Sequence, residues 1–397
     1  MPPVTGTPSL LRAINDRAAL ELLLAHGPLT RPRLGELTGL SKPTASQLLA
    51  RLEQAGLVRR TGSLTGRPGP NAQLYEVNPA AGHAAALAVD PQGITAAIAD
   101  LTGRVVGQHR VPTGDLGSRH TLKPAAEALA GALAATGVPR DAPRHTVIGT
   151  PGALDPRTGR LRYAPHLPAW HSRSLLEDLA ALLGSPVVIE NDVNLAATAE
   201  QHLGAAQDFT DFVLLWADQG VGAAIVLGGS PLRGATGGAG EIGYMPLPGA
   251  PLARGGPQAT ARPDAGGGFQ MLAGSPAVVE LAREHGLPAA TATEALALAV
   301  AATPGAGDAV LTELGRRLAT GLAAVIAVVD PELVVLSGAV CRAGGERLRA
   351  AVEQELTGLA LPRPLVRLGA VTDSPVLTGA LRTALALTRD TVFDTRG

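Results

Sequence analysis

Three polar side chains on one face of a predicted helix have the clearest chemical potential near the start of the chain. Thr44, Gln47 and Arg51 are spaced i, i+3, i+7, which places them on the same side of an α-helix. Outward hydroxyl, amide and guanidinium groups near the start of a helix can contact base edges and phosphates. The pattern therefore predicts a DNA-reading face. The candidate DNA contacts are Ser41, Lys42, Thr44, Ser46, Gln47, Arg51 and Arg67.

The segments around this face predict a helix-turn-helix. A first helix over about 10–25 stops at His26-Gly27-Pro28, and a second over about 31–38 ends at Gly39-Leu40-Ser41. Ser41 is a good N-cap for the third helix, which reaches about residue 55. The apolar positions of the first helix are Leu11, Ile14, Ala18 and Leu22. Those expected to point inward from the third helix are Ala45, Leu48, Leu49 and Leu52.

A hairpin after the third helix completes the pattern of a winged helix. Residues 57–60 and 74–77 have strand character, and the Gly/Pro-rich stretch between them contains Arg67. Residues 1–75 hold nine basic and four acidic side chains, a net charge of +5, whereas the remainder holds 24 and 30, a net of −6. A basic module on an acidic body favours a polyanion as the partner of that module. The alternative is a protein-interaction module with a solvated polar face.

The whole composition indicates a soluble multidomain protein. The chain has 397 residues and 46% apolar content, which exceeds one ordinary domain. A single cysteine, Cys341, excludes a disulfide framework and any multi-cysteine metal site. No apolar stretch reaches the roughly 20 residues of a membrane span. Because a secretory leader pattern is also missing from the first 30 residues, we expect a cytoplasmic protein with no membrane partner.

Beyond the linker 78–82, strands and helices alternate in an α/β pattern. Three strands followed by helix–strand units occur twice, from about residue 84 and from about residue 212. Two similar halves with a cleft between them would suit a small ligand. The expected domains are a winged helix over 1–78, a first α/β lobe over 83–200 completed by a C-terminal helix near 375–388, and a second lobe over 201–374.

Several motifs, in this order and at this spacing, resemble those of ROK-family transcriptional regulators. In the body they are Gly149-Thr150-Pro151-Gly152-Ala153-Leu154-Asp155, Glu190-Asn191-Asp192-Val193-Asn194, Gly240-Glu241-Ile242-Gly243 and Ser337-Gly338-Ala339-Val340. The N-terminal stretch and the wing Gly66-Arg67-Pro68-Gly69-Pro70 are also similar to the family's. The resemblance implies a two-lobed actin-like, ribonuclease-H-like sugar-kinase fold behind a winged helix-turn-helix. It also implies sugar contacts at Gly152, Asn191, Asp192 and Glu241, with Tyr244 and Gln270 where the family has a histidine and a second glutamate.

Both turns that would hold ATP phosphates depart from the family pattern. The first reads Asp90-Pro91-Gln92-Gly93, and proline has no N–H to offer a phosphate. The second reads Asp218-Gln219-Gly220, where a carboxylate would repel an anion. Asp192 matches the family's catalytic base, but without ATP it is expected to accept a hydrogen bond from a sugar hydroxyl. We therefore expect no ATP and no enzymatic activity.

The family's structural zinc is also expected to be absent. Its ligands are a histidine and three cysteines, but Tyr244 takes the histidine position, and residues 203–284 contain no His or Cys. No cofactor is therefore predicted.

The sequence predicts a regulator, and more specifically a repressor of carbohydrate-related genes. Its partners would be operator DNA and a sugar or sugar-phosphate effector. A homodimer or dimer of dimers is expected because one winged helix reads only a half-site. The alternatives are an ATP-dependent sugar kinase with an added DNA-binding domain, and a DNA-binding dimer that responds to no effector.

Overall fold

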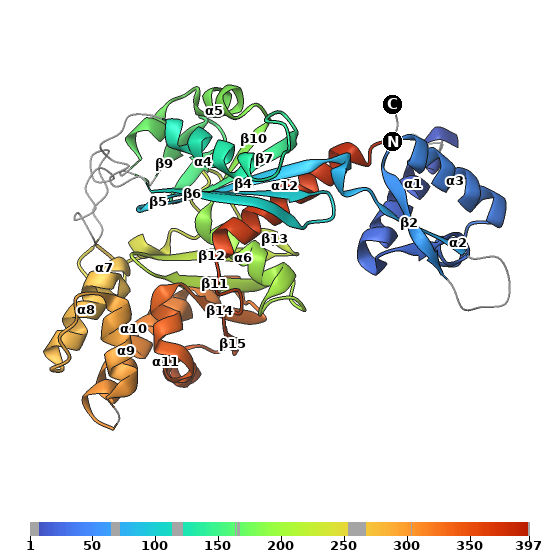
Figure 1. Cartoon of the computed structure of the whole chain (residues 1–397). Helices are drawn as coiled ribbons and strands as arrows, with labels where there is room; N and C mark the ends of the chain where they lie inside the picture. Colours follow the sequence, from blue (N-terminus) through green and yellow to red (C-terminus); the bar gives the residue numbers. More distant parts are fainter. Residues whose placement is uncertain are drawn as a thin grey trace.

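The computed structural model describes residues 8–64, 72–112, 122–162, 164, 167–252, 267–302 and 304–395. A small N-terminal domain stands to one side of two α/β lobes, and a long C-terminal helix reaches from the lobes to that domain (Figure 1). The predicted α/β class with an N-terminal winged helix is confirmed. None of the described helices combines the length and apolar character needed to cross a bilayer.

The N-terminal domain packs three helices against a sheet with strand order β1-β3-β2. The predicted cap forms, because the Ser41 hydroxyl accepts the N–H of Thr44, and Gly39 adopts a φ of 71° in the preceding turn. The inward face expected of the third helix is also buried as predicted. The wing residues 65–71, Arg67 among them, lie outside the described residues. The elements are α1 (Pro8–His26), β1 (Leu29–Thr30), α2 (Arg31–Thr38), α3 (Lys42–Gln54), β2 (Val58–Leu64) and β3 (Ala72–Val77).

Helix α1 leaves part of its predicted apolar stripe exposed, although Leu22 is half-buried against the core. Leu11 and Ile14 are 56% and 53% exposed, whereas Asp16 is buried on the same face as Ala19, Leu20 and Leu23. The helix therefore has two apolar stripes, and the one that contains Asp16 packs in the core of the domain. Periodicity missed that stripe because a buried aspartate needs a charged partner that lies elsewhere in the chain.

The first lobe is a five-stranded sheet in the order β10-β7-β4-β5-β6. Strands β4, β5 and β6 form an antiparallel meander, and β7 and β10 add in parallel beside β4. Helices α4 and α5 cover one face, while α6 and α12 cover the other. The elements are β4 (His83–Asp90), β5 (Gly93–Asp100), β6 (Val105–Pro112), α4 (Lys123–Ala134), β7 (Pro143–Thr150), α5 (Leu175–Leu183), β10 (Val187–Asn191), α6 (Asp192–Leu203) and α12 (Pro375–Val392).

The second lobe repeats this arrangement with the order β13-β12-β11-β14-β15. Again an antiparallel meander is extended by two parallel strands, as the repeated sequence pattern predicts. Helices cover its outer face, and α6 packs on its inner face, so that α6 lies between the two sheets. The elements are β11 (Phe212–Ala217), β12 (Val221–Leu227), β13 (Ser230–Pro231), α7 (Gln270–Ala273), α8 (Ser275–Glu284), α9 (Ala292–Ala301), α10 (Ala306–Val329), β14 (Leu333–Ser337), α11 (Ala339–Leu359) and β15 (Leu365–Leu368).

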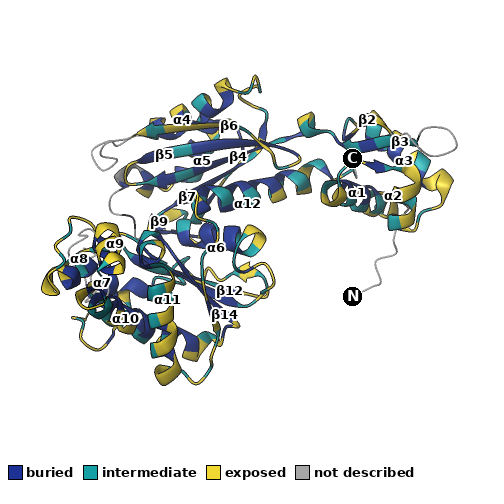
Figure 2. Ribbon diagram, turned by 60° about the horizontal axis from the view of Figure 1, so that its bottom comes forward, coloured by how far each residue is buried: buried dark blue, intermediate teal, exposed yellow. Residues whose placement is uncertain are grey.

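Helix α12 connects the lobes to the N-terminal domain. It packs along β4 and β7 of the first lobe, and its last turn lies in the core of the winged helix, where Phe393 is 2% exposed. Arg389 donates two hydrogen bonds to the carbonyl oxygen of Leu101, at 3.1 and 3.0 Å. Arg17 of α1 pairs with Asp390 at 2.5 Å. Figure 2 shows α12 passing from the buried interior of the lobes to the winged helix.

Candidate functional site

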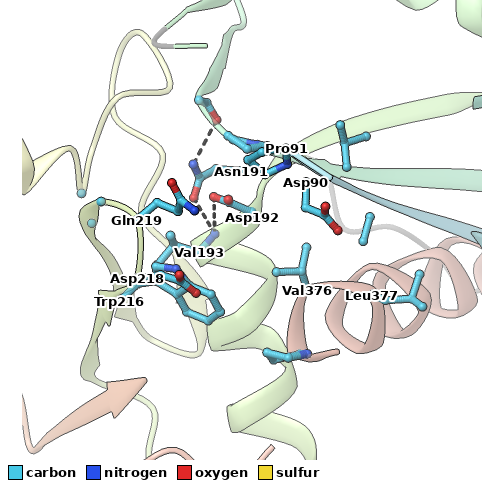
Figure 3. A pocket seen from close by; sticks show the side chains of 18 of the residues that line it. Asp90, Pro91, Asn191, Asp192, Val193, Trp216, Asp218, Gln219, Val376 and Leu377 are labelled. Atoms are coloured by element: carbon cyan, nitrogen blue, oxygen red, sulfur yellow. Dashed lines mark hydrogen bonds between the residues drawn. The ribbon is translucent and has the colours of Figure 1, made fainter. Parts of the chain in front are cut away.

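A cavity of about 480 Å³ lies between the two lobes. Its walls come from the ends of β4, β10 and β11, from the start of α6 and from the first turn of α12 (Figure 3). This volume suits a small ligand. The charged side chains among its described lining residues are Asp90, Arg110, Asp192, Asp218 and Glu241.

Asn191 fixes the position of Asp192 at the start of α6. Its side-chain oxygen caps the helix by accepting the N–H groups of Val193 and Asn194, at 2.9 and 3.1 Å. Its amide nitrogen donates to the carbonyl oxygen of Gly152 at 2.9 Å (Figure 3). Gly152 has a φ of 84°, and a Cβ there would stand 2.2 Å from a backbone oxygen. The turn that receives Asn191 therefore requires glycine.

Two carboxyl groups in the cavity hold their protons more tightly than usual. Burial raises the pKa of Asp192 to about 6, and the charge of Asp218 adds to the shift. Burial also raises the pKa of Glu241 to about 7, with a further contribution from Asp192. Among the described residues, no arginine or lysine forms an ion pair with either group. Both are therefore placed to exchange hydrogen bonds with a hydroxylated ligand.

The turn after β4 uses its polar groups internally. Asp90 accepts the backbone N–H of Gln92 at 2.8 Å. Arg110 donates to both oxygens of Asp90, at 2.8 and 3.0 Å, and to the Thr95 hydroxyl at 2.9 Å. Pro91 contributes no N–H. The carboxylate, the turn and the guanidinium therefore satisfy one another at the mouth of the cavity.

The turn after β11 is likewise closed on itself. The N–H of Asp218 donates to the carbonyl of Gly220 at 2.9 Å. The N–H of Val221 donates to Oε1 of Gln270 at 2.8 Å. The carboxylate of Asp218 accepts the N–H of Ala339, the first residue of α11, at 3.4 Å.

The exposed face of α3 keeps two of the three predicted DNA-reading side chains, Thr44 and Gln47, at the surface. Arg51 is different. Its guanidinium pairs with Asp16 of α1 through Nε at 3.2 Å and Nη2 at 2.5 Å, and the Asp16 side chain is 3% exposed. Arg51 thus has a partner within the domain, as a buried carboxylate requires, and its DNA contact stays a prediction.

Ser41, Lys42 and Ser46 lie at the start of α3, as predicted. Ser41 and Lys42 are exposed, and Ser46 is half-buried. The Ser41 hydroxyl is 2.8 Å from the Thr44 hydroxyl, and the Ser46 hydroxyl donates to the carbonyl of Lys42 at 2.9 Å. The two serine hydroxyls therefore have partners within this turn of α3.

The ROK family profile matches residues 86–386, about three quarters of the chain. The chain belongs to the ROK family. A MarR family profile matches residues 14–67, which begin within α1 and extend through α3 and β2.

The ROK relatives include both regulators and kinases. A putative xylose repressor from Caldicellulosiruptor sp. is 28% identical over 244 residues, and the match spans 61% of each chain. The structure of a ROK transcriptional regulator described as a homologue of Escherichia coli MLC shares the fold over 97% of this chain and 98% of its own, with a TM-score of 0.73 and 21% identity. A ROK hexokinase from Thermus thermophilus is 30% identical, with a TM-score of 0.61 over 78% of this chain and 99% of its own.

The predicted ROK sugar contacts are only partly brought together. Gly152, Asn191, Asp192 and Glu241 line the cavity, whereas Tyr244 and Gln270 are not among its described lining residues. Tyr244 is 49% exposed, and Gln270 supports the turn after β11. Their assignment as sugar contacts stays a prediction. Residue order along the chain does not show where these side chains lie, because that depends on how η4 (Ile242–Tyr244) and α7 pack.

The sequence reasoning missed Trp216, Arg110 and Val376, which also line the cavity. Trp216 stands two residues before the turn 218–220. Its closeness to that turn in the sequence could have marked it as a cavity residue.

The absence of the structural zinc of the ROK family stays a prediction. Among the residues that the structure describes, no group of three or more His, Cys, Asp or Glu side chains could hold a metal ion. Most of the aligned loop, residues 257–266, lies outside the described residues.

Proposed function

We propose that this protein is a DNA-binding transcriptional repressor of carbohydrate-related genes whose interlobe cavity binds a sugar effector. The observation that carries the proposal is the combination of a winged helix with a ROK body that keeps Asp192 and Glu241 in its cavity. The names of the relatives support it, because the regulators that match include a putative xylose repressor.

The cavity supports sugar recognition through its acceptors. Carboxyl groups that are buried but not ion-paired can accept or donate hydrogen bonds to sugar hydroxyls in a low-dielectric site. Trp216 and Val376 add apolar surface beside them, as is common in small-molecule sites. The Asp192 carboxyl is positioned by the backbone N–H of Val193, which donates to it at 2.8 Å.

A regulator is favoured over a kinase by the two turns beside the cavity. Phosphoryl transfer depends almost entirely on positioned backbone N–H groups, cations and metal ions around the transferred group. Here Pro91 lacks an N–H, and Asp218 adds a negative charge. Arg110 is already bound to Asp90.

The DNA-binding side of the proposal rests on the exposed start of α3, with Thr44, Gln47 and Lys42 as contacts. Two copies are required to read a full operator, because each winged helix covers one half-site. A coupling of about 1–3 kcal/mol between sugar and DNA would suffice for control.

The test is fluorescence anisotropy of the full chain on a labelled duplex from the upstream region of its own gene, with a panel of free sugars at fixed salt. Salt is held constant because phosphate contacts make affinity fall steeply with ionic strength. We expect tight binding and release by one sugar. Thr44→Ala combined with Gln47→Ala should weaken DNA binding but leave sugar binding unchanged, and Glu241→Gln should do the reverse.

Two results would contradict the proposal. Tight DNA binding that no sugar alters would indicate a regulator without an effector. Sugar-dependent consumption of ATP by the same preparation would indicate a kinase with an added DNA-binding domain.

A further inference from the structure

Helix α11 begins at the edge of the cavity, and its first N–H group already has an anionic partner. A helix N-terminus carries partial positive charge and free N–H groups, which together favour an anion. Here the Ala339 N–H donates to a carboxylate oxygen of Asp218, at 3.4 Å. The backbones of Gly338 and Ala217 pack closely here, because a Cβ on Gly338 would stand 2.2 Å from the carbonyl oxygen of Ala217. The Asp218 carboxylate thus lies beside the N-terminus of α11, on the side from which an external anion would approach.

Part of the backbone around Asp218 is also engaged within the protein. Its own N–H donates to Gly220, and the N–H of Val221 donates to Gln270. The Ser275 hydroxyl donates to the carbonyl oxygen of Asp218 at 2.7 Å. These contacts fix the turn that carries the Asp218 carboxylate at the cavity.

On the opposite wall, the Asp90 carboxylate is a second internal anion. It accepts hydrogen bonds from the N–H of Gln92 and from both terminal nitrogens of the Arg110 guanidinium. Arg110 is the one guanidinium among the described lining residues, and the paired carboxylate neutralises it. An arriving phosphate would have to displace Asp90 to gain the charge-assisted contact that arginine usually gives.

We propose that Asp218 and Asp90 are specificity-determining residues that act as internal anions and close the cleft to phosphate-bearing ligands, so that the effector is an unphosphorylated sugar. This rests on the proposed function, and it narrows the effector to one of the two classes that the sequence left open. Four carboxyl groups face one guanidinium in the described lining, so a phosphate would meet repulsion at both ends of the cavity.

The test uses inorganic pyrophosphate as the probe, which requires no knowledge of the sugar. Binding to the full chain is measured by titration calorimetry and by intrinsic tryptophan fluorescence, because Trp216, one of the two tryptophans, lines the cavity. We expect no cavity binding by the wild type. Asp218→Ser removes the internal anion and should bind pyrophosphate at least about tenfold more tightly, the equivalent of about 1.4 kcal/mol.

Two further variants separate the effect of the Asp218 charge from changes in shape and in net charge. Asp218→Asn retains the shape and removes only the charge, so it should show a smaller gain in the same direction, and it serves if Asp218→Ser fails to fold. Asp208→Asn changes the net charge equally at an exposed position outside the cavity lining, and it should behave like the wild type. This control also accounts for any pyrophosphate bound to the basic winged helix.

Equal pyrophosphate binding by the wild type and both Asp218 variants would overturn the inference and leave the proposed function standing. The reverse case is also distinguishable. If the variants gain pyrophosphate binding but no free sugar releases DNA from the wild type, phosphate exclusion holds and the sugar-controlled repressor is rejected. Release of DNA by a sugar phosphate, but not by its free sugar, would overturn the inference directly.

Discussion

Carboxyl groups occur at both ends of α12 in opposite settings. Where the helix enters the winged helix, the buried Asp16 pairs with Arg51, and the exposed Asp390 pairs with Arg17. Where the helix begins, Asp192 and Glu241 stand in the cavity with raised pKa values and no ion pair among the described residues. The role of each carboxyl group therefore depends on whether it has an ion-pair partner. A paired carboxylate fastens two elements together, whereas an unpaired one keeps its hydrogen-bonding capacity for a ligand.

Helix α12 connects the cavity with the core of the winged helix. The first turn of α12, with Val376 and Leu377, lines the cavity, and Phe393, the residue just past its last turn, lies in the winged-helix core. A ligand that contacts Val376 therefore touches the same element that fastens the DNA-binding domain.

The largest expected effect on stability comes from truncating Phe393, the buried side chain that joins the end of α12 to the winged-helix core. Phe393→Ala should lower the free energy of unfolding by about 3–5 kcal/mol, because it leaves a cavity in the winged-helix core. Chemical denaturation measures the loss. Leu361→Ala, at a side chain that is 98% exposed, is the matched control and should change stability by less than about 0.5 kcal/mol. A loss below about 1 kcal/mol for Phe393→Ala would show that the junction is not part of the folded core.

Breaking the paired carboxylate should have the next largest effect. Arg51→Ala leaves Asp16 buried without its partner, and we expect a loss of about 2–3 kcal/mol in unfolding free energy, reduced from the fully buried case because Arg51 is partly exposed. Arg33→Ala breaks only an exposed pair with Glu36 and should cost about 0.5 kcal/mol or less.

The same variant separates the structural role of Arg51 from a role in DNA binding. Unchanged stability, together with a salt dependence of DNA binding reduced by about one phosphate contact, would restore Arg51 to the DNA interface.

The carboxyl groups in the cavity should also make the stability of the protein depend on pH. Burial raises the pKa of Glu241 to about 7 in the folded chain, so the unfolded chain ionises first as the pH rises. The folded state is favoured below the ordinary glutamate pKa and loses that advantage as the pH approaches 7. Relative to Glu241→Gln, we expect the wild type to lose about 2 kcal/mol of unfolding free energy between about pH 4 and pH 8.

Thermal unfolding across that pH range measures the difference between the two proteins. Glu177→Gln, at an exposed position of α5, should follow the wild-type profile. Parallel profiles for the wild type and Glu241→Gln would mean that Glu241 ionises in the folded chain as it does in water.

Local patterns in the sequence predicted a large part of this molecule. The cap at Ser41, the turn at Gly39 and the inward face of α3 depend on neighbours within a few residues, and all three are confirmed. The repeated order of strands also predicted two matching sheets, because alternating apolar segments and helices leave few ways to cover a sheet on both faces. The motif with Asn191 and Asp192 likewise marked one wall of the cavity.

Local patterns and motifs were thus sufficient to predict the winged helix, the α/β lobes and the family to which they belong. The buried face of α1, the partner of Arg51 and the direction of Gln270 became visible only in the folded chain. These outcomes depend on contacts between distant parts of the chain, such as Asp16 with Arg51 and with Thr395, which are 35 and 379 positions away. The physical reason is that a buried charge is tolerated only beside its partner, and that partner is brought close by the fold rather than by its place in the sequence.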